Sequence, residues 1–199
     1  MPLSSNQIDQ FHNDGYTTAD SFFSDREVEA MRCELDRLRS DGKLRNVRTQ
    51  GDGQTHSTDR MNLQICPIWP QSDFFRALPF DRKIVDAVGS LIGDPHVFYL
   101  DQIFLKPGQT GSGTNWHQDN AYFQISDPSK GTGMWIAIHD ATVDNGTMSI
   151  IPGSFRESYD HERDPDSDHH IRCWPPENRA VAIELKAGGV LFFNYGTAH

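Results

Sequence analysis

The segment Trp116-His117-Gln118-Asp119 contains the residues whose types and spacing best suit metal chemistry. In an extended strand, side chains alternate between two faces, so His117 and Asp119 point to the same side and can reach one ion. An imidazole and a carboxylate are two of the three ligands of a 2-His-1-carboxylate triad, which leaves coordination positions open on iron. The third ligand expected is His199, which follows the apolar run Val190 to Phe193.

A second His-x-Asp pattern lies near the N-terminus, at His12 and Asp14. It precedes Gly15 and falls outside any strand pattern, so we interpret it as the end of a helix or a turn. A pattern this short also arises by chance. Taken alone, His117 is therefore more typical of a polar strand residue than of a metal ligand, and only the surrounding residues favour the ligand role.

The N-terminal part of the chain is predicted to be helical. Ser24 can cap a helix over residues 25–38, where apolar residues recur at helical spacing. A second, short helix covers residues 84–92 and ends at Gly93-Asp94-Pro95, because glycine and proline both stop a helix. Residues 39–60 show little periodicity and are predicted to form a long loop.

From His96 onward, short β-rich runs alternate with turn residues. The predicted strands cover residues 97–100, 103–105, 134–138, 147–151, 180–185 and 190–193. Regular short strands with Asn-Gly and Pro-Gly turns indicate an antiparallel sandwich or barrel, and the class is α+β or all-β with added helices. The polar residues 160–170 are predicted to form an exposed loop that could act as a lid.

Composition limits the classes of partner. The 199 residues are 36% hydrophobic and carry a net charge of −10, which fits one globular domain over residues 1–199. An acidic chain without long basic runs is a poor match for nucleic acid. No apolar run approaches the roughly 18 residues that span a membrane. The polar N-terminus resembles no secretory signal, and three cysteines without a CxxC pair suggest a reducing compartment, so we expect a cytoplasmic protein.

Four runs of residues carry a family resemblance: FHNDGY at 11–16, GTNWHQDNAYF at 113–123, WIAIHDATVDNG at 135–146 and IIPGS at 150–154. Together they resemble the phytanoyl-CoA dioxygenase family of iron(II)/2-oxoglutarate-dependent oxygenases. The resemblance implies a mostly β chain with flanking helices, folded as a double-stranded β-helix, which is a cupin-like jelly roll. The helical part would cover about residues 1–95 and the β-rich, metal-binding part about residues 96–199.

The resemblance also implies a reaction and a set of ligands. Iron(II) would be held by His117, Asp119 and His199, and would use 2-oxoglutarate and O2 to hydroxylate a small-molecule metabolite, with succinate and CO2 as co-products. Trp135 falls where the family places an indole beside 2-oxoglutarate. Gln102 is a second candidate for a polar contact to this co-substrate.

Three further residues near the metal strand are candidates to face the substrate: Asn120, Tyr122 and Lys106. A surface or core role is the alternative for each of them, and Trp135 is equally compatible with a core aromatic residue. Because Asp119 supplies a carboxylate, the halogenating variant of the family is disfavoured. The substrate and the oligomeric state stay open.

The C-terminus departs from the family pattern. Members normally continue past the distal histidine, with an arginine about ten residues later that pairs with the far carboxylate of 2-oxoglutarate, whereas this sequence stops at His199. We therefore expect a truncated chain; alternatively, another basic residue anchors the co-substrate. Two other functions remain open: a non-catalytic jelly-roll paralogue that binds metal or ligand, and a metal-dependent cupin that works without 2-oxoglutarate.

Overall fold

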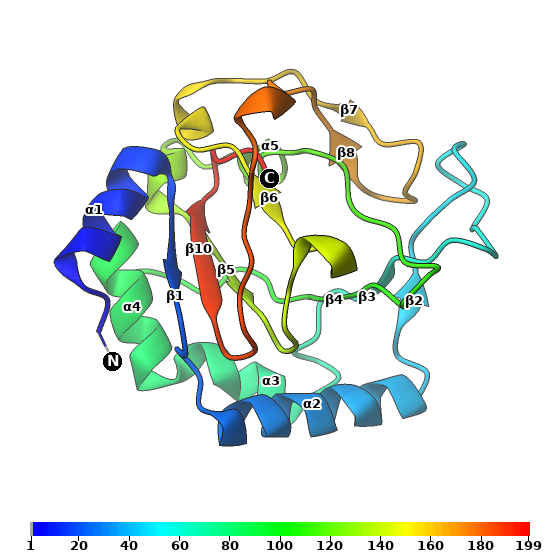
Figure 1. Cartoon of the computed structure of the whole chain (residues 1–199), viewed down its shortest axis with the longest axis horizontal. Helices are drawn as coiled ribbons and strands as arrows, with labels where there is room; N and C mark the ends of the chain where they lie inside the picture. Colours follow the sequence, from blue (N-terminus) through cyan, green and yellow to red (C-terminus); the bar gives the residue numbers. More distant parts are fainter. Residues whose placement is uncertain (1) are drawn as a thin grey trace.

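The chain folds into α-helices, most of them in its first half, and short β-strands in a computed structural model that describes residues 2–199 (Figure 1). The α-helices are α1 (Ser5–Asp14), α2 (Asp25–Ser40), α3 (Asp73–Ala77), α4 (Arg82–Ile92) and α5 (Asn120–Phe123). The strands are β1 (Tyr16–Ala19), β2 (Arg45–Asn46), β3 (Leu63–Ile65), β4 (Ile103–Leu105), β5 (Thr132–Ile136), β6 (Ser149–Ile150), β7 (Glu162–Arg163), β8 (Ile171–Arg172), β9 (Val181–Ala182) and β10 (Val190–Asn194).

Both predicted helices are confirmed, and their capping chemistry explains their ends. The Ser24 hydroxyl accepts from the Glu27 amide at the start of α2 while the Glu27 carboxylate accepts from the Ser24 amide, which is a capping box. Helix α4 ends at Gly93, whose φ of 88° favours a residue without a Cβ. The helices therefore begin and end where local chemistry satisfies their free backbone groups.

The sheet β1-β10-β5 is the central layer that leads to the C-terminus. All five residues of β10 are buried, and both neighbours run antiparallel to it. The strand β1, which pairs with β10, was not predicted within the helical N-terminal part. Its cause is local: Gly15 adopts a left-handed conformation (φ 83°) after α1, and the chain turns back to lie along β10.

A second sheet, β2-β3-β4, lies on the other side of the molecule, and α2 runs along one edge beneath both sheets (Figure 1). Ile65 and Ile103 of this sheet share one hydrophobic cluster with Met31 and Leu38 of α2 and with Phe192 of β10. A smaller cluster occupies the opposite face of the central sheet. Helix α2 thus holds the two sheets together through their apolar faces.

Some predicted strands differ from the structure. Residues 97–100 form no strand: Val97 is 86% exposed and Tyr99 66%, because no described segment pairs with them. The other predicted strands exist in whole or in part, but none exceeds five residues. The expected mostly β chain is therefore corrected to a mixed helix and strand fold, in which much of the β-rich half is held by turns and isolated bridges. No helix among residues 2–199 is long and apolar enough to cross a membrane.

Candidate metal centre

The two segments that carry the predicted metal ligands lie antiparallel to each other. The His117 amide donates to the His199 carbonyl at 3.1 Å, and the His199 amide donates to the His117 carbonyl at 3.0 Å. Gln118 and Ala198 form an isolated bridge between the same segments. This pairing places His199 directly beside the His-x-Asp segment, as the sequence predicts.

The side chains of His117, Asp119 and His199 converge. Each offers one ligand atom, and the three atoms all lie within 4.8 Å of one another; no other His, Cys, Asp or Glu group in residues 2–199 meets this criterion. The Asp119 Oδ1 atom is 3.7 Å from His117 Nε2 and 3.9 Å from His199 Nε2. Asp119 itself has helical backbone angles at the start of α5, so the convergence arises at a strand-to-helix turn rather than within a regular strand.

Backbone carbonyls orient both imidazoles. His117 Nδ1 lies 3.0 Å from the Asn115 carbonyl and His199 Nδ1 lies 2.9 Å from the Thr197 carbonyl, which places the ring proton on Nδ1 in each case. The lone pair of each Nε2 is then directed at the other ligands. This is the arrangement by which outer hydrogen bonds prepare histidine for a metal.

Burial shifts the pKa values of all three ligands toward their neutral forms. Desolvation, with a smaller repulsion between the two imidazoles, lowers the pKa of His117 to about 4, and desolvation lowers that of His199 to about 4. Desolvation also raises the pKa of Asp119. The histidines are therefore unprotonated at neutral pH and available as metal ligands, and a bound cation would favour the ionised form of Asp119.

The predicted co-substrate residues differ in their placement. Trp135 lies opposite Leu191 in the sheet and packs on the apolar cluster that includes Phe193. The Phe193 ring is 4.3 Å from that of His199, so Trp135 shares a face of the sheet with the metal ligands. Gln102 is exposed just before β4, and its co-substrate role stays a prediction.

The predicted substrate residues are similarly divided. The Tyr122 ring stands edge-on to His117, with 5.9 Å between ring centroids. Asn120 uses its side-chain amide to bond the backbone of Ile125, at 3.0 and 3.2 Å. Lys106 donates to the Gly146 carbonyl at 2.6 Å, and burial lowers its pKa although part of the side chain is exposed. Tyr122 alone of the three borders the ligand group, and the substrate role of all three stays a prediction.

Gln118 is a structural residue that the sequence reasoning missed. Its side chain is buried and donates to the carbonyls of Gly196 at 2.6 Å and Glu157 at 2.9 Å. It thus ties the His-x-Asp segment to the turn before His199. The only signal in the sequence is its position between two ligands.

A family model and curated relatives agree on one family for this chain. The family model described as Phytanoyl-CoA dioxygenase (PhyH) matches residues 11–199. The ectoine dioxygenase of Bordetella bronchiseptica is 24% identical, with 99% of this chain aligned to 69% of that protein. A phytanoyl-CoA dioxygenase of Arabidopsis thaliana is 27% identical, with 99% of this chain aligned to 82% of that protein.

Solved structures share the fold. The non-heme alpha ketoglutarate dependent carbocyclase SnoK from nogalamycin biosynthesis superposes with a TM-score of 0.80 at 23% identity, over 98% of this chain and 76% of that one. EctD from S. alaskensis, solved with 2-oxoglutarate and 5-hydroxyectoine, gives 0.76 at 24% identity, over 99% of this chain and 69% of that one. With a family model that covers nearly its whole length, this chain belongs to the phytanoyl-CoA dioxygenase family of iron(II)/2-oxoglutarate-dependent oxygenases.

Proposed function

We propose that this protein is an iron(II)/2-oxoglutarate-dependent dioxygenase that hydroxylates a small-molecule metabolite. The observation that carries the proposal is the convergence of His117, Asp119 and His199, with both Nε2 atoms free of other partners. Two imidazoles and one carboxylate are the donor set that binds iron(II) on one face and leaves positions open. The donor set therefore fits the metal that the family uses.

The chain's own residues have distinct tasks in this proposal. His117, Asp119 and His199 would hold the iron. When bound, iron(II) with 2-oxoglutarate and O2 supplies the oxidation, in which one oxygen atom enters succinate with loss of CO2 and the other enters a substrate C–H bond. Trp135 and Phe193 provide an apolar wall beside the ligands, which limits the access of water to the reacting groups.

We propose that the two sheets form the walls of a double-stranded β-helix, with the metal ligands between them, in a single domain. The central sheet β1-β10-β5 and the sheet β2-β3-β4 lie on opposite sides of the ligand segments in Figure 1. The high TM-scores to SnoK and EctD support this arrangement. The relatives' names include both ectoine and phytanoyl-CoA, so the proposed substrate is a small molecule without a more specific class.

An anaerobic titration tests the proposal. Purified protein is mixed with iron(II) and then with 2-oxoglutarate, and the weak visible charge-transfer band of the chelate is recorded. We expect the band in the wild-type protein and in His12→Ala, whose histidine lies in the N-terminal helix, and its loss in His117→Ala. Iron binding without a band would contradict the proposal and favour the metal-binding paralogue.

A further inference from the structure

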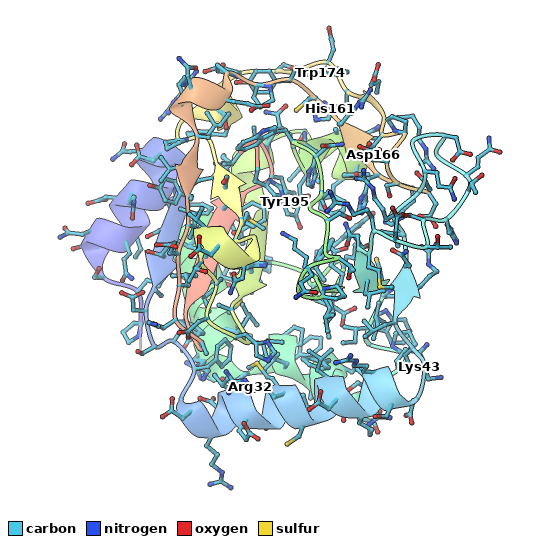
Figure 2. The ribbon with its side chains drawn as sticks, turned by 45° about the vertical axis from the view of Figure 1, so that its right-hand side comes forward. Arg32, Lys43, His161, Asp166, Trp174 and Tyr195 are labelled. Atoms are coloured by element: carbon cyan, nitrogen blue, oxygen red, sulfur yellow. The ribbon has the colours of Figure 1, made fainter. Side chains whose placement is uncertain are left out.

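The polar, histidine-rich residues 160–170, which the sequence predicts to form an exposed loop that could act as a lid, have no role in the proposed reaction. In the structure they lie within a longer segment, residues 159–173. In the structure β7 and β8 pair within it, with Glu162 opposite Arg172. The hairpin lies at the same end of the molecule as the C-terminus (Figure 1), and Figure 2 shows His161 and Asp166 along this edge.

The hairpin segment, residues 159–173, is bound along residues 115–122, the segment that carries His117 and Asp119, rather than free to open. Six hydrogen bonds join it to residues 115–122. The donors and acceptors are Gln118 N to His161 Nε2 (3.0 Å), Asn115 Nδ2 to both Asp164 carboxylate oxygens (3.0 Å each), Tyr159 N to Gln118 Oε1 (3.4 Å), Ile171 N to the Tyr122 hydroxyl (2.9 Å) and Cys173 N to the Trp116 carbonyl (2.8 Å). Two side chains of the hairpin segment, His161 and Asp164, take part in these bonds.

Asp164 is the more informative of these side chains. It is only 2% exposed, and a buried carboxylate is costly unless hydrogen bonds satisfy it. Both of its oxygens accept from the Asn115 side chain, and one also accepts from the Asp166 amide at 2.9 Å. The Asn115 carbonyl in turn lies 3.0 Å from His117 Nδ1. Asn115 therefore links the two residues, with its side-chain amide bonded to Asp164 and its backbone carbonyl bonded to His117, a proposed metal ligand.

His161 bonds to the backbone of the segment that carries His117 and Asp119. Its Nδ1 lies 2.8 Å from the Tyr159 carbonyl, so Nδ1 carries the proton and Nε2 accepts from the Gln118 amide. Gln118 is the residue between His117 and Asp119. The contact therefore fixes the peptide that separates the two ligands.

We infer that the hairpin segment positions the metal ligands: Asp164, through Asn115, orients the His117 ring, and His161 fixes the strand between His117 and Asp119. Both are positioning residues, and the inference rests on the proposed function for the identity of the metal. Hydrogen-bonded groups behind a metal ligand typically contribute about 10- to 100-fold in metal affinity.

An exchange of the Asp164 and Asn115 side chains tests the inference with cobalt(II) alone as the probe. Asp164→Asn replaces one of the two acceptor oxygens with a second NH2 donor, and Asn115→Asp places two carboxylates against each other, so each single variant should bind cobalt(II) about 10- to 100-fold more weakly. The double variant restores one amide opposite one carboxylate and should recover most of the affinity. Asp160→Asn, an exposed acid in the same segment, is the control and should bind like the wild type.

A second readout separates positioning from a merely structural role. In the metal-free protein, ¹⁵N shifts of the His117 ring report which nitrogen carries the proton. We expect the Nδ1–H form in the wild type and the double variant, and a rising share of the Nε2–H form in each single variant. Single variants that lose thermal stability but keep cobalt affinity and ring tautomer would overturn the inference, as would a double variant no better than the singles.

The two readouts also separate this inference from the proposed function. A wild-type protein that binds no cobalt(II) at His117 contradicts the proposed metal centre. The tautomer comparison in metal-free protein then still decides whether Asp164 orients His117.

Discussion

His117, His161 and His199 make the same local contact. Each places Nδ1 at 2.8 to 3.0 Å from the carbonyl of the residue two positions earlier, so that each Nε2 is an acceptor or a ligand. In extended backbone the residue two positions earlier lies on the same face, which makes this contact available to a strand histidine. At the residue scale, backbone carbonyls set the ring protons of the two histidines of the proposed metal centre.

The carboxylate at Asp119 is expected to favour metal binding at the expense of folding stability. Burial raises its pKa, so ionisation at neutral pH costs free energy in the metal-free fold. We expect Asp119→Asn to bind cobalt(II) at least tenfold more weakly and to increase the metal-free unfolding free energy by about 1 kcal/mol. Urea unfolding with a chelator present measures this. A loss of stability equal to that of Asp119→Ala would contradict it.

Stability should depend on pH through His170, which is not a proposed ligand. Desolvation, with a smaller repulsion from His169, lowers its pKa to about 3, against 6.5 in the unfolded chain. Between these values the unfolded state binds a proton that the folded state does not, so this residue makes stability fall as pH drops from 6.5 toward 3. Between pH 6 and 5, we expect His170→Asn to reduce the change of the unfolding free energy with pH by about 1 kcal/mol per pH unit. Urea titrations at the two pH values check this, and an unchanged slope would contradict it.

At the scale of elements, strands β5 and β10 bring the distal histidine into place through close packing. Gly133 in β5 lies opposite Phe193 in β10, and the Phe193 ring packs on His199 with 4.3 Å between centroids. A Cβ added at Gly133 would lie 2.4 Å from an atom of the Phe193 ring. Any side chain at position 133 would therefore clash with the Phe193 ring. Glycine at this position allows the ring to stay in its place against His199.

Substitution of this glycine tests the coupling between sheet packing and the metal centre. We expect Gly133→Ala to displace Phe193, to lower the unfolding free energy by about 1 to 3 kcal/mol and to weaken cobalt(II) binding. Gly108→Ala is the matched control, because an added Cβ there meets no atom within 4 Å. Urea unfolding and cobalt titration provide the two measurements. Wild-type cobalt affinity in Gly133→Ala would show that His199 does not depend on the Phe193 ring.

At the scale of the whole molecule, the proposed metal joins two segments that are remote in sequence. His117 and Asp119 follow the loop after β4, whereas His199 follows β10, and α2 packs beneath both sheets. A ligand that binds only when these segments are assembled stabilises the entire fold by mass action.

Metal binding should therefore raise the global stability. At cobalt(II) concentrations about 100-fold above Kd we expect the unfolding free energy to increase by about 2.7 kcal/mol, with a matching rise in Tm. Thermal unfolding with and without the metal measures this. His199→Ala should lose the increase, whereas His56→Ala, an exposed histidine on another loop, should keep it. An equal metal-induced rise in His199→Ala would contradict the proposed ligand set.

Local sequence determines the ends of two helices and predicts the candidate ligand group. The caps at Ser24 and Gly93 fix the ends of α2 and α4, because hydrogen bonds and backbone angles within a few residues suffice. The spacing of His117 and Asp119, together with the extended family runs, likewise predicts a ligand group that the structure assembles.

Only the tertiary structure decided the features that depend on remote partners. Residues 97–100 have strand composition but no described strand beside them, and Tyr16–Ala19 become a strand because β10 lies alongside. Asp164 is one acid among several in a polar run, and its burial against Asn115 has no local signature. Local composition determines which hydrogen bonds a residue can make, whereas long-range packing determines which of them it makes.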